Sequence, residues 1–372
     1  MTGYYIHENY IVDGVVTVPG VQKKVSEQIK VMGRDFSVQE VVLNLKPQTF
    51  INKLRRRLPW DSNTYYWDAI IDQLVNPDFI YIRKPLLDNG SHKFLKQFRK
   101  KYPKAKVLLE IPTYPYDQEL ITGIKDYPLY WKERIYRSKL HRFVDRIVTY
   151  SDDKTIFGIP AICIQNGVNV AEHPIRETKA NTDEIHLIAV ASFQKYHGYE
   201  RVINALAEYY KRNGTRKIVL DMVGGGDELA EYRKLTESLN LQEHVVFWGP
   251  KHGEELRQVF DQADIGLGSF GFYKIGLTVA SSLKLREYLA RGLPVIGGSR
   301  QDLFTEETFP YYLEFPNDAS NLDMERIIDF YNRIYRNRET YEEVVQHIRE
   351  YAEENVTWKK TFAPVMEYLG NQ

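Results

Sequence analysis

The segment that most constrains the fold of this chain spans residues 269–299 and reads SFGFYKIGLTVASSLKLREYLARGLPVIGGS. A short apolar strand at residues 264–268 precedes it, and a loop, a helix and a second buried strand at residues 293–296 follow. Gly292 stands where a glycine would end the helix. Two buried strands with a helix between them indicate parallel pairing, because parallel neighbours need a crossover connection.

The start of this helix predicts a site for an anion. Ser281 or Ser282 can cap the helix, and Lys284 lies in its first turn. The amide groups of a helix N-terminus, a free hydroxyl and a lysine together attract a phosphate group. Glu287 follows Lys284 by three residues, so both side chains share one face of the helix. A carboxylate and an ammonium can therefore reach the same ligand.

The length of the chain predicts two domains. Its 372 residues exceed one ordinary domain and suit two of about 150 to 200 residues each. The apolar content of 43% is enough for each domain to bury a core. The polar stretch at residues 171–184 indicates the crossing between them, so we place the domains at residues 1–168 and 169–355.

The net charge is zero, but it is unevenly distributed. Residues 1–165 contain 26 Lys and Arg against 18 Asp and Glu, whereas the remainder contains 24 against 32. The balanced total does not favour nucleic-acid binding, and the basic first half could meet an acidic surface.

The single cysteine favours a cytoplasmic setting. Cys163 lies in the apolar run AICI and has no second cysteine with which to form a disulfide, so we interpret it as a small buried hydrophobe. We find no pattern of a signal peptide and no apolar run that approaches the roughly 18 residues of a membrane span.

Strand and helix patterns alternate through the first half and predict a mainly parallel, doubly wound sheet. The expected strands are residues 4–12, 38–45, 79–83 and 105–111, and the expected helices are residues 21–32, 63–74, 92–101 and 130–144. In the last helix, the apolar side chains Tyr130, Trp131, Ile135 and Leu140 would pack on the sheet. The alternative is that this helix lies on a membrane surface.

Two basic regions stand out in this half. One is the KLRRR run at residues 53–57, which we expect in a loop. The other comprises Lys93, Lys96, Arg99, Lys100, Lys101, Lys104 and Lys106. Each is typical of a solvated face, and the alternative is a patch for anionic lipid head groups.

The stretch EIPTYPYDQE follows a strand of the first half and predicts a functional loop. Its two prolines fix the backbone where a parallel sheet presents its binding site. The polar side chains are Glu110, Thr113, Tyr114, Tyr116, Asp117 and Glu119. We expect this loop to contact a ligand. The carboxylate pair at Asp152 and Asp153 is interpreted as an exposed turn and not as a metal site.

Four segments of the second half carry a resemblance to a known family. They are LKLREYLARGLPVI, HGYERVINAL, VGGGDEL and QNGVN. Together they resemble the nucleotide-sugar domain of retaining, family 4-like GT-B glycosyltransferases. The resemblance implies an α/β fold of two doubly wound Rossmann-like domains that face each other across a cleft. It also implies that residues 356–372 form a helix returning to the first domain.

The resemblance implies a site without a metal or a cofactor. In it, Glu287 would bind the ribose, and Lys284 and His197 would stabilise the departing diphosphate. The expected nucleotide-sugar residues are Gly20, Lys195, Gly224, Gly225, Gly226, Gly249, Ser281, Ser282, Lys284 and Glu287. We name Lys284, His197 and Glu110 as catalytic candidates, and Thr113, Tyr114, Tyr116 and Asp117 as acceptor contacts.

The sequence departs from the family pattern at two places. Ser192 and His197 stand where the family has an arginine and a lysine, so Lys195 or Arg201 would supply the missing charge. Val279 stands where the family has the first glutamate of a Glu-x7-Glu pattern that ends at Glu287. The role of that glutamate would pass to Glu110, to Asp117 or to the loop at Tyr273 and Lys274, or activity would be lost.

The resemblance implies a cytoplasmic glycosyltransferase that uses a nucleotide sugar, which we expect to be UDP-linked, in the synthesis of a surface glycan. Its acceptor would be a lipid-linked or other glycan, with peripheral contact to the inner face of the membrane. Two alternatives remain open at this point: a non-catalytic GT-B protein that binds a partner, and a GT-B epimerase of UDP-sugars.

Overall fold

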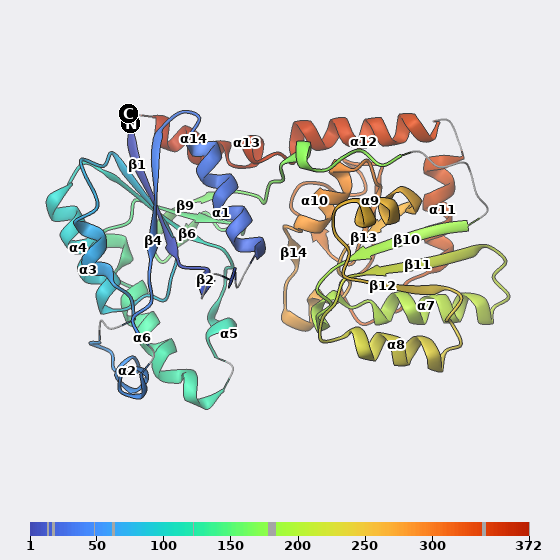
Figure 1. Cartoon of the computed structure of the whole chain (residues 1–372), viewed down its shortest axis with the longest axis horizontal. Coiled ribbons are helices and arrows are strands. Elements are labelled where there is room, and N and C mark those ends of the chain that lie inside the picture. Colours follow the sequence, from blue (N-terminus) through green and yellow to red (C-terminus); the bar gives the residue numbers. More distant parts are fainter. Residues whose placement is uncertain are drawn as a thin grey trace. The chain divides into compact units, whose positions relative to one another are not determined.

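The computed structural model describes residues 1–12, 15–16, 19–47, 49–61, 64–121, 123–177, 184–336 and 340–371 (Figure 1). The chain forms two compact units: unit 1 comprises Met1–Gln165 and Thr361–Gln372, and unit 2 comprises Asn166–Lys360. The chain therefore divides after residues 165 and 360, where the sequence suggested 168 and 355.

Unit 1 is built on a seven-stranded sheet of order β4-β1-β5-β6-β7-β9-β8. Its strands are β1 (Thr2–Glu8), β4 (Ser37–Leu43), β5 (Phe79–Arg83), β6 (Lys106–Ile111), β7 (Arg146–Thr149), β8 (Thr155–Ile156) and β9 (Ile159–Cys163). All neighbours pair in parallel except β8 and β9. β5 is buried along its whole length, as expected for a central strand covered on both faces.

Outside this sheet, β2 (Ile11–Val12) pairs antiparallel with β3 (Val15–Val16). Most of the other regular structure of unit 1 consists of α-helices. They are α1 (Pro19–Met32), α2 (Phe50–Arg55), α3 (Trp67–Ile71), α4 (Asn89–Lys101), α5 (Asp117–Leu120), α6 (Tyr127–Arg137) and α14 (Ala363–Gly370). The last helix packs in unit 1, where Lys106 Nζ donates to the carbonyl oxygens of Tyr368 at 2.9 Å and Leu369 at 3.1 Å. In contrast, α13 (Trp358–Thr361) spans the boundary between the units.

Three expected elements of unit 1 differ in the structure. The first strand ends at Glu8 instead of residue 12. The basic run at residues 53–57 begins inside α2, because Thr49 caps that helix by accepting from the backbone amide of Asn52 at 3.3 Å. The helix expected at residues 63–74 is limited to α3, and residue 63 lies outside the described residues.

The predicted orientation of α6 is wrong. Its buried residues include Lys132 and Glu133, whereas Trp131 and Ile135 are 54% and 40% exposed. Glu133 is buried because its carboxylate accepts from the backbone amide of Leu87 at 2.5 Å and pairs with Lys84, which follows β5, at 3.0 Å. Trp131 and Ile135 of the predicted apolar stripe therefore face outward, whereas Leu140, which lies beyond the end of the helix, is buried as predicted.

Two smaller predictions concern Asp152 with Asp153 and Cys163; the first is confirmed and the second is not. Asp152 and Asp153 lie in an exposed turn after β7, as predicted. Cys163 is only partly buried at the end of β9, and its Sγ lies 3.5 Å from the carbonyl oxygen of Asp153. It is therefore not the fully buried hydrophobe that its apolar run suggested.

Unit 2 has a six-stranded parallel sheet of order β12-β11-β10-β13-β15-β17. Its strands are β10 (Glu184–Val190), β11 (Lys217–Val223), β12 (Val245–Gly249), β13 (Ile265–Leu267), β15 (Val295–Gly297) and β17 (Tyr312–Glu314). Its helices are α7 (Glu200–Lys211), α8 (Leu229–Ser238), α9 (Gly253–Gln262), α10 (Leu283–Ala290), α11 (Met324–Tyr335) and α12 (Tyr341–Asn355). A small parallel pair, β14 (Val279–Ala280) with β16 (Arg300–Gln301), accompanies the main sheet.

The helix α10 ends at the glycine that the sequence predicted, and the structure shows how it is tied to the sheet. Gly292 ends the helix region with a φ of 77°, and a Cβ there would lie 2.6 Å from the side chain of Val345. The hydroxyl of Tyr288 accepts from the backbone amide of Val190 at 2.8 Å, which ties α10 to β10. The N-terminus of α10 is thereby held at the carboxyl edge of the sheet.

Candidate functional site

The candidate site of unit 2 is formed by loops at the carboxyl edge of its parallel sheet. Strands β10, β11 and β13 end at Val190, Val223 and Leu267, and the loops that follow them lie at the same edge. This arrangement brings residues 191–198 and residues 268–272 toward the start of α10.

Glycines allow these loops to touch each other. Gly224 has a φ of 130°, and a Cβ there would lie 2.0 Å from the carbonyl oxygen of Ala191. Gly226 is equally confined, with its Cβ position 2.4 Å from the backbone nitrogen of Phe193. A Cβ at Gly225 would meet only a proline side chain at 3.9 Å. Two of the three consecutive glycines are therefore needed to join the loops, and Gly225 is the one that faces open space.

The ammonium of Lys284 lies in the first turn of α10 and is held by the protein. Its Nζ donates to the hydroxyl of Tyr199 at 3.2 Å, and that hydroxyl donates to the carbonyl oxygen of Leu267 at 3.3 Å. Burial lowers the pKa of Lys284 to about 7, although the charge of Glu287 opposes this shift. A partly desolvated ammonium of this kind gains from an anionic ligand, which would replace its lost hydration.

The imidazole of His197 provides a neutral donor near Lys284. Its Nδ1 accepts from the backbone amide of Gln194 at 3.0 Å, so the ring proton resides on Nε2. Burial, together with the charge of Lys284, lowers the pKa of His197 to about 3. The side chain is therefore uncharged near neutral pH and can donate a hydrogen bond through Nε2–H.

The N-terminus of α10 is fixed from two directions. Ser282 is the N-cap residue in an extended conformation, and its side chain makes no capping hydrogen bond. Ser281 accepts from Asn166 twice, through Oγ at 3.0 Å and through its carbonyl oxygen at 2.7 Å. Arg286 donates to both carboxylate oxygens of Asp302, at 2.6 and 2.8 Å. The first amide groups of α10 are thus held in place without a side-chain cap.

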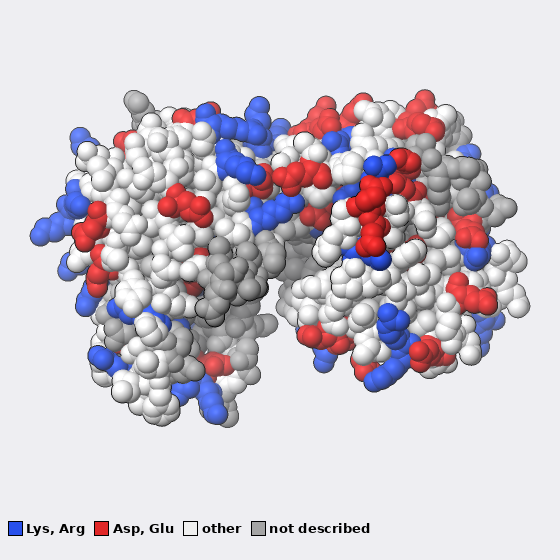
Figure 2. All heavy atoms as spheres, viewed as in Figure 1, with Lys and Arg blue, Asp and Glu red and all other residues white. Residues whose placement is uncertain are grey.

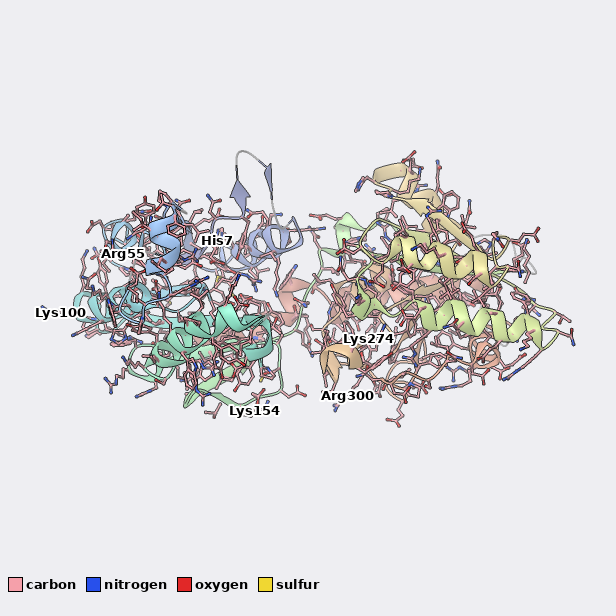
Figure 3. All side chains as sticks on the ribbon, turned by 90° about the horizontal axis from the view of Figure 1, so that it is seen from below. His7, Arg55, Lys100, Lys154, Lys274 and Arg300 are labelled. Atoms are coloured by element: carbon pink, nitrogen blue, oxygen red, sulfur yellow. The ribbon has the colours of Figure 1, made fainter. Side chains whose placement is uncertain are left out.

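Lys195 and Arg201 were expected to supply the positive charge that the family has at Ser192 and His197. Lys195 is exposed, whereas Arg201 donates to backbone carbonyl oxygens. The guanidinium of Arg201 is buried and donates to the carbonyl oxygen of Phe270 at 2.7 Å and that of Ser320 at 2.6 Å. Arg201 therefore joins loops and cannot also bind a phosphate. Similarly, Lys274, which is labelled in Figure 3, pairs with Glu200 at 2.5 Å, so it does not replace the carboxylate absent at Val279.

Val279 lies in the short strand β14, opposite Arg300 of β16 in a parallel register. The side chain is partly buried, and no carboxylate occupies this position. The remaining expected residue of this region, Gly249, ends β12 with a φ of 68°, and no atom lies within 4 Å of the place a Cβ would take.

Glu110 in unit 1 has a structural role instead of the catalytic one we expected. Its carboxylate is fully buried and accepts from Tyr81 at 2.7 Å and from Arg83, which lies beside it in the register of β5 and β6. Burial alone would raise the pKa of Glu110, but the charges of Arg83 and Lys24 hold it below its usual value. The carboxylate is therefore ionised and occupied by its neighbours.

The expected acceptor residues divide into two groups. Thr113 is exposed and Tyr114 is half-buried at the carboxyl end of β6, where a ligand could reach them. Tyr116 is buried and donates to Glu133 at 2.8 Å, whereas Asp117 pairs with Arg137. The hydrogen bond from Arg137 lowers the pKa of Asp117. These last two side chains are thus used within unit 1.

Gly20 lies in the first turn of α1 and is exposed, with no atom within 4 Å of its would-be Cβ. Residues 13, 14, 17 and 18 of the preceding loop lie outside the described residues.

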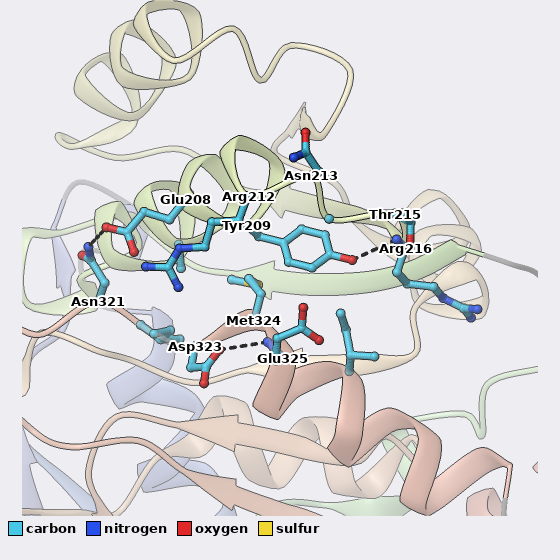
Figure 4. Close-up of a pocket in the computed structure, with 14 residues that line it drawn as sticks. Glu208, Tyr209, Arg212, Asn213, Thr215, Arg216, Asn321, Asp323, Met324 and Glu325 are labelled. Carbon is cyan, nitrogen blue, oxygen red and sulfur yellow. Dashed lines mark hydrogen bonds between the residues drawn. The ribbon is translucent and has the colours of Figure 1, made fainter.

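A separate pocket of 460 Å³ lies at the opposite edge of the unit 2 sheet, beside the start of β11 (Figure 4). Its polar side chains bond within the protein: Asn321 donates to Glu208 at 2.6 Å, and the amide of Arg216 donates to Tyr209 at 2.8 Å. The pocket therefore does not belong to the strand-end site.

Two site residues were missed by the sequence analysis, although both lie in segments that it quoted. Tyr199 in HGYERV binds the lysine, and Asn166 in QNGVN binds the helix start. Neither carries a charge or a catalytic pattern, so only their contacts identify them.

Within the described ranges, no group of three or more His, Cys, Asp and Glu side chains could hold a metal ion. The search for spans, over the same residues, finds no helix with the length and apolar character needed to cross a bilayer.

Solved structures share the architecture of the whole chain. HepE of Anabaena, in complex with UDP, is 12% identical with a TM-score of 0.64, and all of both chains is covered. Sucrose-phosphate synthase of Thermosynechococcus elongatus is 15% identical with a TM-score of 0.62, covering 99% of this chain and 97% of that one. The lipopolysaccharide outer core galactosyltransferase WaaB is 13% identical with a TM-score of 0.58, covering 99% and 100%.

These likenesses define the fold class as GT-B, which confirms the predicted α/β architecture of two Rossmann-like domains. Residues 171–307 also match the family model described as Glycosyl transferases group 1, and this segment contains His197, Lys284 and the start of α10. Among curated proteins, none matches the sequence of this chain.

Proposed function

We propose that this protein is a glycosyltransferase that moves a sugar from a nucleotide sugar, UDP-linked, to a hydroxyl group of a glycan acceptor with retention. The observation that carries the proposal is the group formed by Lys284, the neutral His197 and the uncapped start of α10. All three lie in the segment that matches the glycosyl transferases group 1 model. The complex of HepE with UDP supports the choice of nucleotide.

The chemistry follows from where charge develops. The bond between the anomeric carbon and the diphosphate oxygen breaks, and its electron pair leaves with the diphosphate. Lys284, His197 Nε2–H and the amide groups of α10 would stabilise this negative charge without a metal or a cofactor. The acceptor oxygen bonds to the same face of the sugar, and its proton passes to the departing diphosphate. Glu287 would accept hydrogen bonds from the ribose, and Lys195 would add charge to the diphosphate site.

The acceptor side of the proposal rests on unit 1. Of the four expected acceptor contacts, Thr113 is exposed and Tyr114 is half-buried, so we propose these two as acceptor contacts. The likeness to a lipopolysaccharide galactosyltransferase supports a role in surface polysaccharide or glycoconjugate synthesis. The acceptor would then be a lipid-linked or other glycan. The protein would bind it in the cytoplasm, with peripheral contact between the protein and the membrane.

The test is stabilisation by nucleotides. A thermal-shift series with UDP, GDP, dTDP and their sugars should show stabilisation by the UDP group, about 2.7 kcal/mol at a hundredfold excess over the dissociation constant. Lys284→Ala should abolish the shift and the transfer reaction, because the diphosphate loses its principal cation. Lys234→Ala, an exposed lysine on α8, is the matched control and should change neither. Unchanged transfer in Lys284→Ala would refute the assignment.

One observation favours a second candidate function. Val279 provides no carboxylate where the resembled family has one, and the nearby Lys274 is paired with Glu200. A non-catalytic GT-B protein that binds a partner would fit this gap. It predicts neither transfer nor hydrolysis of any nucleotide sugar, and no thermal shift with any of the nucleotides in the same series.

A further inference from the structure

One part of unit 1 exposes an unusual number of large apolar side chains. They lie on α2 with the turn that follows it, and on α6 (Figure 1). The exposed apolar residues of these two segments are Phe50, Ile51, Leu54, Leu58, Trp60, Tyr127, Trp131 and Ile135. Phe50 is 84% exposed and Trp60 is 69% exposed, which is far from the usual burial of such residues. We call this group the α2–α6 surface.

Hydrogen bonds join the two segments into one surface. Lys132 Nζ of α6 donates to the carbonyl oxygen of Arg56 at 2.9 Å, and Tyr136 donates to that of Pro59 at 2.8 Å. The carbonyl oxygen of Trp60 accepts from Asn89 at 2.8 Å. The polar side of α6 is used in these bonds, and this is why its apolar side remains outside.

Basic side chains lie among the exposed apolar ones. Arg55, Arg57 and Arg134 are exposed, and Arg55 projects from α2 in Figure 3. The guanidinium of Arg134 lies 5.5 Å from the ring centre of Trp131. Among the acidic residues of these segments, Asp61 and Glu133 are buried, and Asp126 at the N-terminus of α6 is partly buried. On the face drawn in Figure 2, the lower end of unit 1 shows basic side chains among uncharged ones, with an acidic side chain beside them. The surface is thus apolar, aromatic and positively charged.

We propose that the α2–α6 surface binds the interface of an anionic lipid bilayer. Aromatic and aliphatic side chains enter the boundary between head groups and acyl chains, while arginines meet the lipid phosphates. Charge complementarity selects this occupant, because the arginines of the surface are exposed, whereas two of its three carboxylates are buried and the third, Asp126, is partly buried. The inference deepens the proposed function by naming the surface that would bring unit 1 to a lipid-linked acceptor.

The basic cluster on and after α4 is a suitable comparison within the same unit. Arg99 is used there by Asp145 at 2.5 Å, and Lys106 binds the C-terminal helix. Lys96 and Lys100 are exposed, but the apolar residues of α4 are buried. This cluster has exposed charge but no exposed apolar side chains. Variants in it therefore distinguish electrostatic attraction to the lipid head groups from insertion of apolar side chains into the bilayer.

The experiment is sedimentation of the full chain with vesicles of phosphatidylcholine alone or with one third phosphatidylglycerol. We expect binding that depends on phosphatidylglycerol and weakens with salt. Arg55→Gln with Arg57→Gln should weaken binding about 25-fold, at about fivefold per charge. Trp60→Ala with Trp131→Ala should weaken it at least about tenfold, because two inserted aromatic rings are lost.

The control Lys96→Gln with Lys100→Gln removes the same charge from α4 and should retain binding within about threefold. Equal losses in the control and the arginine variant would overturn the proposal, as would absence of binding to any vesicle. Concentration-dependent self-association that requires Trp60 and Trp131 would overturn it in favour of a second copy of the chain. All substituted side chains are exposed, so thermal melting should confirm unchanged folding.

Vesicle binding needs no sugar transfer, so this experiment fails or succeeds independently of the proposed function. Transfer to a water-soluble acceptor should remain in the tryptophan variant, whereas transfer to an acceptor embedded in anionic vesicles should fall with its binding.

Discussion

At the scale of the single residue, Lys284 shows how a binding site can cost stability. The protein keeps this ammonium partly buried beside Tyr199, with its pKa lowered to about 7, whereas an unfolded lysine has a pKa of about 10.4. A depressed pKa means that the folded state holds the proton less firmly than the unfolded state. The free energy of unfolding is therefore reduced at and below pH 7, and the reduction is relieved as the pH rises toward 10.

We predict that Lys284→Gln stabilises the protein in the absence of nucleotide. The gain should be about 2 kcal/mol at pH 6.5, after allowance for partial solvent screening, because the cost of the desolvated charge is removed. It should decline between pH 7 and pH 10. Urea unfolding at several pH values measures this, and a gain that does not vary with pH would contradict the assigned cause.

At the scale of the element, buried polar groups determine which faces of the helices turn inward. Glu110 of β6 forms ion pairs with Arg83 of β5 and Lys24 of α1. It also accepts a hydrogen bond from the hydroxyl of Tyr150, which follows β7. These partners come from separate parts of the chain, so the carboxylate joins strands and helix in the core of unit 1. Such a buried ion pair is costly to break because the remaining partner keeps its charge.

Glu110→Gln is therefore expected to destabilise the protein by about 3–5 kcal/mol, since Arg83 would remain buried without its counter-charge. The double variant Glu110→Gln with Arg83→Met should lose less than the sum of the two single changes, because no charge is left unpaired. Urea unfolding of the three variants tests this. Additive losses would show that the two side chains do not interact.

At the scale of the whole molecule, the sequence predicted the architecture better than the details of the site. Apolar runs that alternate with helical patterns predict parallel α/β units, because such strands are buried on both faces. The position of Lys284 and Glu287 at the start of α10 followed from the local sequence. The inward face of α6 did not, because Glu133 is buried by Lys84 and Leu87, which lie far from it in the chain.

The same reason explains why two of the expected site residues have partners within the protein. Arg201 was a candidate for phosphate because its charge is visible in the sequence, but the carbonyl groups that bind it belong to distant loops. Glu110 follows the pattern of a strand-end carboxylate, yet the pairing of β5 with β6 places it beside Arg83, with which it forms a buried ion pair. Local patterns locate elements, whereas long-range pairing decides which polar side chains remain available.

Removal of residues 361–372 should destabilise unit 1 by about 5 kcal/mol and leave unit 2 nearly unchanged. Phe362, Val365 and Leu369 are fully buried in unit 1, and each contributes about 1.5–3 kcal/mol. Hydrogen exchange measured separately for peptides of each unit would show the difference. Equal loss of protection in both units would contradict the assignment of this segment to unit 1.

The return of α14 to unit 1 also sets an order of assembly during synthesis. Unit 2 has its last residue once Lys360 has left the ribosome, but unit 1 still lacks part of its core at that moment. The nascent first unit must therefore wait, incompletely packed, while the whole of the second is translated. Unit 1 is thus completed after unit 2, although most of it is synthesised first.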